Sequence, residues 1–164
     1  MIKVIFVCLG NICRSPLGEG IFRHLVADAG LADRFEIDSA GTGNWHVGKP
    51  PHHGSQRVAK ERGLDISGQR ARQIQIEDLD DYDYVVAMDS KNLTDIRDLD
   101  PLRKTSAQVV RMMDFAPARG LEDVPDPYFG GPEGFDHVYE LVEEASRGLL
   151  EHIAREQGLP LSTR

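Results

Sequence analysis

A short segment near the start of the chain combines residue types that could hold an anion beside a reactive thiol. Cys8 and Arg14 stand six residues apart, with Gly10 and Asn11 between them. Gly10 and Asn11 tolerate positive φ angles, which allow backbone N–H groups to curl into an anion-binding nest. Arg14 offers a planar guanidinium that matches two oxygens of a phosphate group. A thiol in such a positive field is expected to be a thiolate near neutral pH, and therefore a nucleophile.

The same residues have a simpler interpretation, in which Cys8 is a buried cysteine at a strand end and Arg14 lies on the surface. We favour an anion site because several independent requirements are met in one segment. An apolar run precedes it, and Ser15 and Pro16 begin an amphipathic stretch, where the free N–H groups of a helix start attract anions. The glycine-rich nucleotide motifs GxxxxGK[ST] and GxGxxG do not follow the first apolar run, which disfavours a nucleotide site.

Hydrolysis of a phosphate ester by a thiolate also needs an acid for the leaving group, and Asp126 is the best candidate. It lies between Pro125 and Pro127, which stiffen the backbone, in a loop rich in proline. Tyr128 and Phe129 would give it apolar neighbours, which favour the protonated acid. The alternative is an ordinary Asp-Pro turn with its aromatic residues packed inward.

Three other features leave two interpretations open or favour the simpler one. Trp45, in a loop rich in glycine, could stack on an aromatic substrate or anchor the loop to the core. Asp89 could cap the helix that follows it or contact Arg14. The six histidines show no metal-ligand spacing, so we predict no metal site and interpret His52 and His53 as a solvated loop pair.

Strands and helices alternate along the chain, which places these residues at one edge of a sheet. Apolar runs and helical periodicity predict strands at 2–8, 35–40, 84–88 and 109–112, and helices at 14–29, 54–62, 90–98 and 133–156. Such alternation implies right-handed crossovers and a doubly wound, four-stranded parallel sheet that is covered on both faces. Ligands of these sheets bind beyond the carboxyl ends of the strands. The candidate residues follow predicted strands, so we expect them to meet at that edge.

Length and composition limit the class of protein. A chain of 164 residues fits a single domain spanning 1–164. The net charge of −8 disfavours nucleic acid as a partner. No segment reaches the ~20 apolar residues of a membrane-spanning helix, and the start of the chain lacks a signal-peptide pattern. We therefore expect a cytoplasmic monomer that needs no cofactor.

The segment 7–16, together with Asp38-Ser39-Ala40-Gly41-Thr42 and Asp126-Pro127-Tyr128, resembles the low-molecular-weight protein tyrosine phosphatase family. The resemblance extends over essentially the whole chain. It implies a three-layer α/β/α sandwich of the flavodoxin-like, phosphotyrosine phosphatase I type. It also implies hydrolysis of phosphotyrosine in proteins, with Cys8 as nucleophile, Arg14 as phosphate clamp and Asp126 as general acid.

Further roles follow from the same resemblance. Asn11 would hold the loop conformation, the Ser15 hydroxyl would stabilise the Cys8 thiolate, and Cys13 would trap Cys8 in a reversible disulfide. The phosphate would bind in the loop formed by residues 8–15. We expect the substrate to contact Leu9, Gly10, Asn11, Ile12, Cys13, Ser15, Trp45, Tyr128 and Phe129.

Two departures and three alternatives accompany the resemblance. Gln69 stands where relatives often carry a histidine, and His52-His53-Gly54 follows a Pro-Pro turn where acidic and basic residues are common. An arsenate reductase of the same fold is disfavoured, because that chemistry passes oxidation to cysteines beyond Cys8 and Cys13. Phosphoarginine phosphatases usually carry a small polar residue where Ile12 stands. A phosphate-binding module without turnover would be favoured if Cys8 or Asp126 were replaced.

Overall fold

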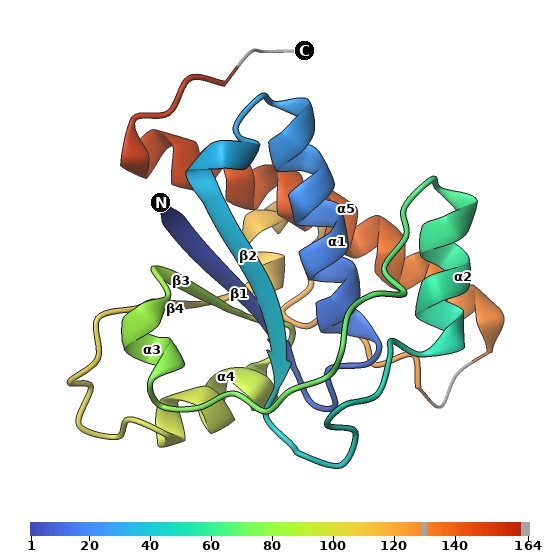
Figure 1. The fold of residues 1–164 in the computed structure, drawn as a ribbon, viewed down its shortest axis with the longest axis horizontal. Helices are drawn as coiled ribbons and strands as arrows, with labels where there is room; N and C mark the ends of the chain where they lie inside the picture. The colour runs from blue at the N-terminus through green and yellow to red at the C-terminus, as the bar shows by residue number, and fades with distance from the viewer. Residues whose placement is uncertain (129–130, 162–164) are drawn as a thin grey trace.

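The computed structural model describes residues 1–128 and 131–161, and these form a four-stranded parallel sheet. The spatial order of the strands is β2-β1-β3-β4, so that β1 lies in the middle of the sheet beside β2 and β3 (Figure 1). The strands are β1 (Ile2–Cys8), β2 (Phe35–Gly41), β3 (Tyr84–Ala87) and β4 (Gln108–Arg111). The parallel sheet of the sequence analysis is therefore confirmed, and all four carboxyl ends lie at the same edge.

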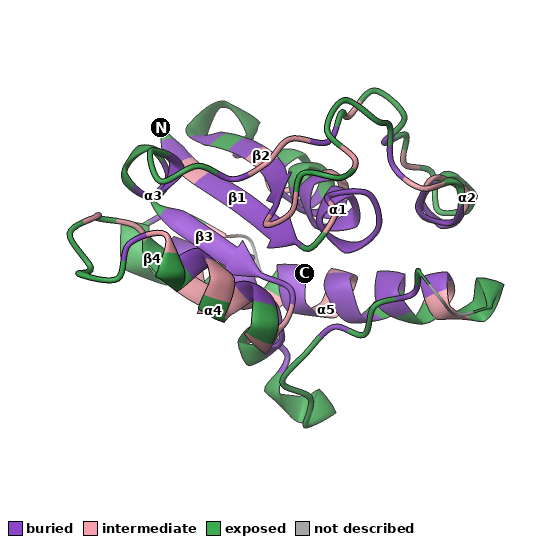
Figure 2. Ribbon diagram, turned by 90° about the horizontal axis from the view of Figure 1, so that it is seen from below, coloured by how far each residue is buried: buried purple, intermediate pink, exposed green. Residues whose placement is uncertain are grey.

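Helices cover both faces of the sheet, because successive residues of a strand point to opposite sides. Val4 and Phe6 of β1 belong to a core shared with α1 and α5, whereas Ile5 and Val7 belong to a core shared with α3 and α4. Figure 2 shows β1 and β3 largely buried between these layers, whereas the edge strand β4 is partly exposed. The α-helices are α1 (Arg14–Asp28), α2 (His53–Glu61), α3 (Asp78–Asp81), α4 (Ser90–Asp98) and α5 (Pro132–Gln157). The arrangement is the expected three-layer α/β/α sandwich.

Differences from the sequence prediction concern short elements. The structure adds α3 and three turns of 3₁₀ helix, which are too short for a periodic pattern to reveal. These turns are η1 (Ala32–Arg34), η2 (Met112–Phe115) and η3 (Pro117–Arg119). None of the helices in the described residues is long and apolar enough to cross a membrane.

The carboxyl edge of the sheet holds the loop between β1 and α1 in place. The amide of Thr42 donates to the Cys8 carbonyl oxygen (2.9 Å), and the amide of Met88 donates to that of Val7 (2.9 Å). Gly41, the last residue of β2, faces the loop so closely that a Cβ there would lie 2.8 Å from the Leu9 carbonyl oxygen. Only glycine lets the two backbones approach to this distance, and the phosphate-loop candidate is thereby seated against the strand.

Candidate active site

The loop between β1 and α1 turns through Asn11. Asn11 has a φ of 56°, in the left-handed region that asparagine tolerates better than most residues. Our expectation that Gly10 shares this conformation is wrong, since the φ of Gly10 is not positive. Gly10 is instead required by space, because a Cβ there would lie 2.9 Å from Cδ2 of His46. The curl of the loop therefore depends on one asparagine, and the glycine makes room for a neighbouring ring.

A buried hydrogen-bond network fixes the thiol of Cys8. The Cys8 sulfur lies 3.0 Å from the Ser15 hydroxyl oxygen, which accepts a hydrogen bond from the Asn11 side-chain amide at 2.8 Å. The hydroxyl proton of Ser15 is thus left for the Cys8 sulfur or for the more distant Ala40 carbonyl oxygen at 3.4 Å. The shorter distance favours donation to the sulfur, which is the contact that the proposed role of Ser15 requires.

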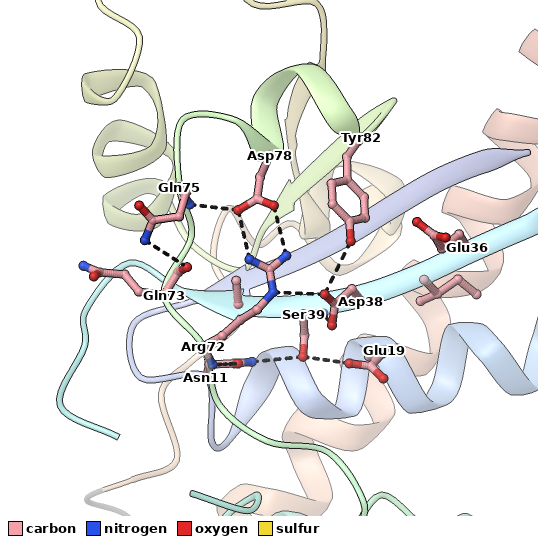
Figure 3. Close-up of polar contacts among 12 residues, drawn as sticks. Asn11, Glu19, Glu36, Asp38, Ser39, Arg72, Gln73, Gln75, Asp78 and Tyr82 are labelled. Carbon is pink, nitrogen blue, oxygen red and sulfur yellow. Dashed lines mark hydrogen bonds and ion pairs between the residues drawn. The ribbon is translucent and has the colours of Figure 1, made fainter. Parts of the chain in front are cut away.

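The network continues from Asn11 behind the loop (Figure 3). The same amide donates to the Ser39 hydroxyl (3.0 Å), and Ser39 donates to Glu19 (2.9 Å). Burial raises the pKa of the Glu19 carboxyl. The side-chain oxygen of Asn11 (Oδ1) accepts a hydrogen bond from the backbone N–H of Arg72 (3.0 Å). Both ends of the Asn11 side chain are therefore held, which fixes its left-handed backbone.

Arg72 joins the network through its guanidinium as well as through its backbone amide. Its guanidinium binds Asp78 with two hydrogen bonds of 3.0 Å and Asp38 with one of 3.0 Å, as Figure 3 shows. Gln69 donates to the Pro16 carbonyl oxygen (3.0 Å). Asn11 is held instead by the Arg72 backbone amide, whose position a sequence motif does not reveal.

Arg14 is almost fully buried under the loop and faces two carboxylates. It donates to Asp89 (2.6 Å) and to the Val124 carbonyl oxygen (2.9 Å), and it lies 3.8 Å from the carboxylate of Asp126. Burial by itself would lower the pKa of Arg14, but the neighbouring Cys8 and Asp89 outweigh burial and raise it. The guanidinium is thus a fixed positive charge, already oriented before any anion binds.

Asp89 performs both of the roles that the sequence left open. One carboxylate oxygen accepts from the Asn92 amide (2.7 Å) and caps α4, while the other binds Arg14. A helix cap is therefore used to orient the buried arginine.

Asp126 lies in the turn that the sequence suggested, but Tyr128 is 42% exposed rather than packed inward. The backbone N–H of Tyr128 donates to the Asp126 carboxylate at 3.0 Å, which is an Asp turn. The loop is anchored just before it, since the Val124 amide donates to the Met88 carbonyl oxygen (2.8 Å). The turn thereby directs a carboxylate, 38% exposed, toward Arg14 and the loop of residues 8–15.

These groups line a pocket of about 170 Å³ at the carboxyl edge of the sheet. Trp45 is 67% exposed at its mouth, which contradicts the interpretation of this residue as a core anchor. Asn11 and Ser15 lie beneath the pocket rather than on its wall, and Phe129 lies outside the described residues. The lining residues are Cys8, Leu9, Gly10, Ile12, Cys13, Arg14, Trp45, His46, Asp126 and Tyr128.

Cys13 lines the same pocket as Cys8, and both thiols are free and buried. Burial, and then the charges of Cys8 and Asp126, raise the pKa of the Cys13 thiol to about 12. Cys13 is therefore a neutral thiol near neutral pH.

Sequence reasoning missed two histidines at the site. His46 lines the pocket beside Trp45, and its position next to that residue in a glycine-rich loop was the one available signal. His52 is not a solvated loop residue as we expected. Its Nδ1 caps α2 by accepting from the Gly54 amide (3.0 Å), and its ring stacks on Phe135.

Comparison with known proteins agrees with this geometry. Residues 3–159 match the model of the family described as low molecular weight phosphotyrosine protein phosphatase. The low molecular weight protein-tyrosine-phosphatase YfkJ of Bacillus subtilis is 45% identical over 97% of this chain and 100% of its own length. A low molecular weight protein-tyrosine-phosphatase of Streptomyces coelicolor is 46% identical over 94% of each chain.

Solved structures show the same likeness. The crystal structure of Bacillus subtilis YfkJ matches with a TM-score of 0.90 at 44% identity, over 96% of this chain and 97% of that chain. A Drosophila arginine phosphatase matches with a TM-score of 0.87 at 34% identity, over 93% of this chain and 98% of that chain. On these grounds, this chain belongs to the low molecular weight phosphotyrosine protein phosphatase family and is a protein-tyrosine phosphatase.

Proposed function

We propose that Cys8, Arg14 and Asp126 together hydrolyse phosphotyrosine through a phosphocysteine intermediate. The observation that carries this proposal is that the three side chains line one pocket, with the arginine buried and Asp126 3.8 Å from it. In the first step the Cys8 thiolate attacks phosphorus, the bond to the tyrosine oxygen breaks, and Asp126 gives that oxygen its proton. In the second step a water attacks the phosphocysteine and gives its proton to Asp126. Phosphate leaves, and the Cys8 thiolate is restored.

The phosphate loop stabilises the charge that spreads over the three equatorial oxygens. Arg14 is held by Asp89 and the Val124 carbonyl oxygen, so little reorganisation is needed when the phosphate binds. Backbone N–H groups of the curled loop supply the remaining donors. The hydrogen bond between Cys8 and Ser15 supports a thiolate as both attacking and leaving group.

The substrate class follows from the walls of the pocket. Ile12, Trp45 and Tyr128 present apolar and aromatic surface, which suits a phenyl ring better than the guanidinium of phosphoarginine. The similarity to a Drosophila arginine phosphatase makes phosphoarginine the alternative to test. We further propose that the chain acts as a monomeric single domain in the cytoplasm, where a nucleophilic thiol stays reduced, and that Cys13 protects Cys8 by forming a disulfide.

A direct experiment compares hydrolysis of a phosphotyrosine peptide, p-nitrophenyl phosphate and phosphoarginine, each with and without a metal chelator. We expect the two aryl phosphates to be preferred, and activity to survive the chelator because the mechanism uses no metal. Cys8→Ser should abolish turnover while the melting temperature stays close to that of the original protein, since serine is nearly isosteric with cysteine. Turnover by Cys8→Ser, loss of activity with chelator, or a preference for phosphoarginine would contradict the proposal.

A further inference from the structure

His52 lies where three parts of the active site meet. Its backbone N–H donates to the Ile12 carbonyl oxygen of the phosphate loop (2.7 Å). Its Nδ1 accepts from the Gly54 amide (3.0 Å), which makes it the N-cap of α2. Its ring stacks on Phe135 of α5, with the centroids 5.0 Å apart and the planes inclined by 17°. One side chain therefore connects the phosphate loop to two helices.

The same ring also supports the loop that carries Asp126. The edge of the His52 ring meets the Tyr128 ring, with a centroid distance of 5.7 Å and an interplanar angle of 68°. The Tyr128 backbone N–H is the donor that holds the Asp126 carboxylate (3.0 Å). Asp126 is more than a third exposed, so its orientation depends on this turn. Any displacement of Tyr128 from His52 moves the donor that orients Asp126.

We propose that His52, as a neutral imidazole, is a positioning residue that acts through Tyr128 to hold Asp126 at the leaving-group oxygen. The inference rests on the proposed role of Asp126 as the acid. His52 itself does not line the pocket, so it acts on the reaction through its neighbours.

The neutral form is needed because Nδ1 must offer a lone pair to the Gly54 amide. A proton on Nδ1 would face that N–H group and remove the cap. Burial, and then the stacked His53, lower the pKa of His52 from its ordinary value of 6.5, so the folded protein favours the neutral ring. The titratable groups in ring contact with His52 are His53 of α2 and Tyr128. Phe135 of α5 and the Ile12 peptide are uncharged.

Two substitutions separate the ring of His52 from its cap. His52→Asn keeps a side-chain acceptor for the N-cap but removes the ring. His52→Phe keeps a ring against Phe135 and Tyr128 but removes the acceptor. His53→Asn is the matched control, because His53 is exposed and begins α2 beside the same ring. The three variants and the original protein would be compared by melting temperature and by kcat/KM.

Leaving groups of different acidity supply the readout that a purely structural role would not change. Phenyl phosphate needs its leaving oxygen protonated, whereas p-nitrophenyl phosphate needs this much less. For His52→Asn we expect kcat/KM for phenyl phosphate to fall roughly tenfold, while that for p-nitrophenyl phosphate falls less than about twofold. His52→Phe should keep the original ratio of the two rates but melt about 2–4 °C lower, because the cap is lost. His53→Asn should leave the ratio unchanged.

The pH dependence supplies an independent check. Protonation of His52 is favoured in the unfolded chain, so stability present above pH 6.5 should decline as the pH falls below that value. In the folded protein the ring is protonated only below its lowered pKa, so the rate on phenyl phosphate relative to p-nitrophenyl phosphate should fall at a lower pH than the one at which stability begins to decline. His52→Phe should keep the original ratio of the two rates to lower pH, since a phenyl ring cannot be protonated.

Several outcomes would overturn the inference. Equal losses on both substrates in His52→Asn, or a lower melting temperature with an unchanged ratio, would restrict the His52 ring to packing against Phe135 and Tyr128. A ratio in His52→Phe that follows pH as the original protein does would exclude a titrating ring. If Asp126→Asn itself shows no dependence on the leaving group, the acid assignment fails together with the inference. If Asp126→Asn shows a dependence on the leaving group and His52→Asn does not, the acid assignment stands and the inference about His52 alone fails.

Discussion

The two sides of the pocket are built differently. On the inner side, Asn11, Arg14 and Ser15 are each at most 3% exposed. Asn11 donates to Ser15, and Arg14 donates separately to Asp89. On the outer side, Trp45 and Tyr128 are 67% and 42% exposed. Beyond the backbone anchor at Val124, the turn of Asp126 contacts the rest of the protein through the ring of Tyr128 against His52. A buried polar network holds one geometry, because any displacement leaves a polar group unpaired. Ring contacts at the surface leave no buried polar group unpaired when they shift, so the outer side is held less rigidly than the inner side.

The largest effect is expected at Asp126, the one residue of the outer side that we propose to take part in the chemistry. Asp126→Asn should lower kcat/KM for phenyl phosphate by about 10²–10⁴-fold, the usual contribution of a general acid. Turnover of aryl phosphates with increasingly acidic leaving groups measures the effect, and the loss should shrink along the series. Equal losses for good and poor leaving groups would mean that Asp126 only shapes its turn.

The inner side is tested at Asn11. Asn11→Ala leaves the Ser15 and Ser39 hydroxyls and the Arg72 amide with fewer partners, and it forces alanine into a left-handed backbone. We expect a loss of about 2–4 kcal/mol in the free energy of unfolding, from about 1–3 kcal/mol for unpaired buried groups plus the backbone strain. Denaturant titration measures this loss.

Asn11→Gly is the matched control, because glycine accepts the left-handed backbone but also lacks the amide. Glycine should relieve the backbone strain but not restore the hydrogen bonds. The free energy of unfolding of Asn11→Gly should therefore lie between those of Asn11→Ala and the original protein. If Asn11→Gly is as stable as the original protein, the buried network contributes nothing, and the contrast between the two sides disappears.

The same contrast explains how much could be predicted from the sequence. The inner side is nearly contiguous, so Cys8, Arg14 and Ser15 were placed correctly from one segment between a strand and a helix. Residues that join the network from afar were missed. Arg72 contributes a backbone amide, and its guanidinium pairs with Asp38 and Asp78 from separate elements, which no local pattern indicates.

The outer side is assembled from segments that lie far apart in the sequence, and its contacts were harder to predict. His52 looked like a solvated loop residue because its stacking partner Phe135 lies far along the chain. Trp45 was correctly placed near the pocket, but only the structure shows that its ring is exposed rather than anchored. Strand and helix bounds were predictable because apolar periodicity is local, whereas ring contacts depend on how the elements pack.

Oxidation by peroxide should distinguish the two cysteines of the inner side, Cys8 and Cys13. Cys8 should be oxidised to a sulfenic acid, while Cys13, whose pKa is raised to about 12, stays a thiol. The sulfenic acid is neutral, so the Cys8 charge that helps to raise the pKa of Cys13 is lost. Cys13 can then attack the Cys8 sulfur as the S–OH bond breaks, the thiol proton and the hydroxide leave together as water, and a disulfide forms. We expect complete loss of activity, which a thiol reductant restores.

Cys13→Ser is the control for this protection. The original protein should lose the mass of two hydrogen atoms and recover several-fold more activity than Cys13→Ser, which should gain oxygen atoms on Cys8. Intact mass and recovered rate after reductant are measured on both proteins. Equal recovery without the mass loss would show that Cys13 only packs beneath the loop.

The smallest effect is expected at the most exposed residue of the outer side. Trp45→Ala should lower kcat/KM for a phosphotyrosine peptide by about fivefold, since stacking on an aromatic ring contributes on the order of 1 kcal/mol. A small alkyl phosphate has no ring to stack, so its turnover should be unchanged. Stability should hardly change either, because a side chain that is 67% exposed loses little packing when it is truncated. Trp45→Phe keeps an aromatic face and should recover part of the peptide rate. Equal losses on both substrates would mean that Trp45 shapes the phosphate loop through its neighbour His46, and the outer side would then be as rigidly coupled to the chemistry as the inner one.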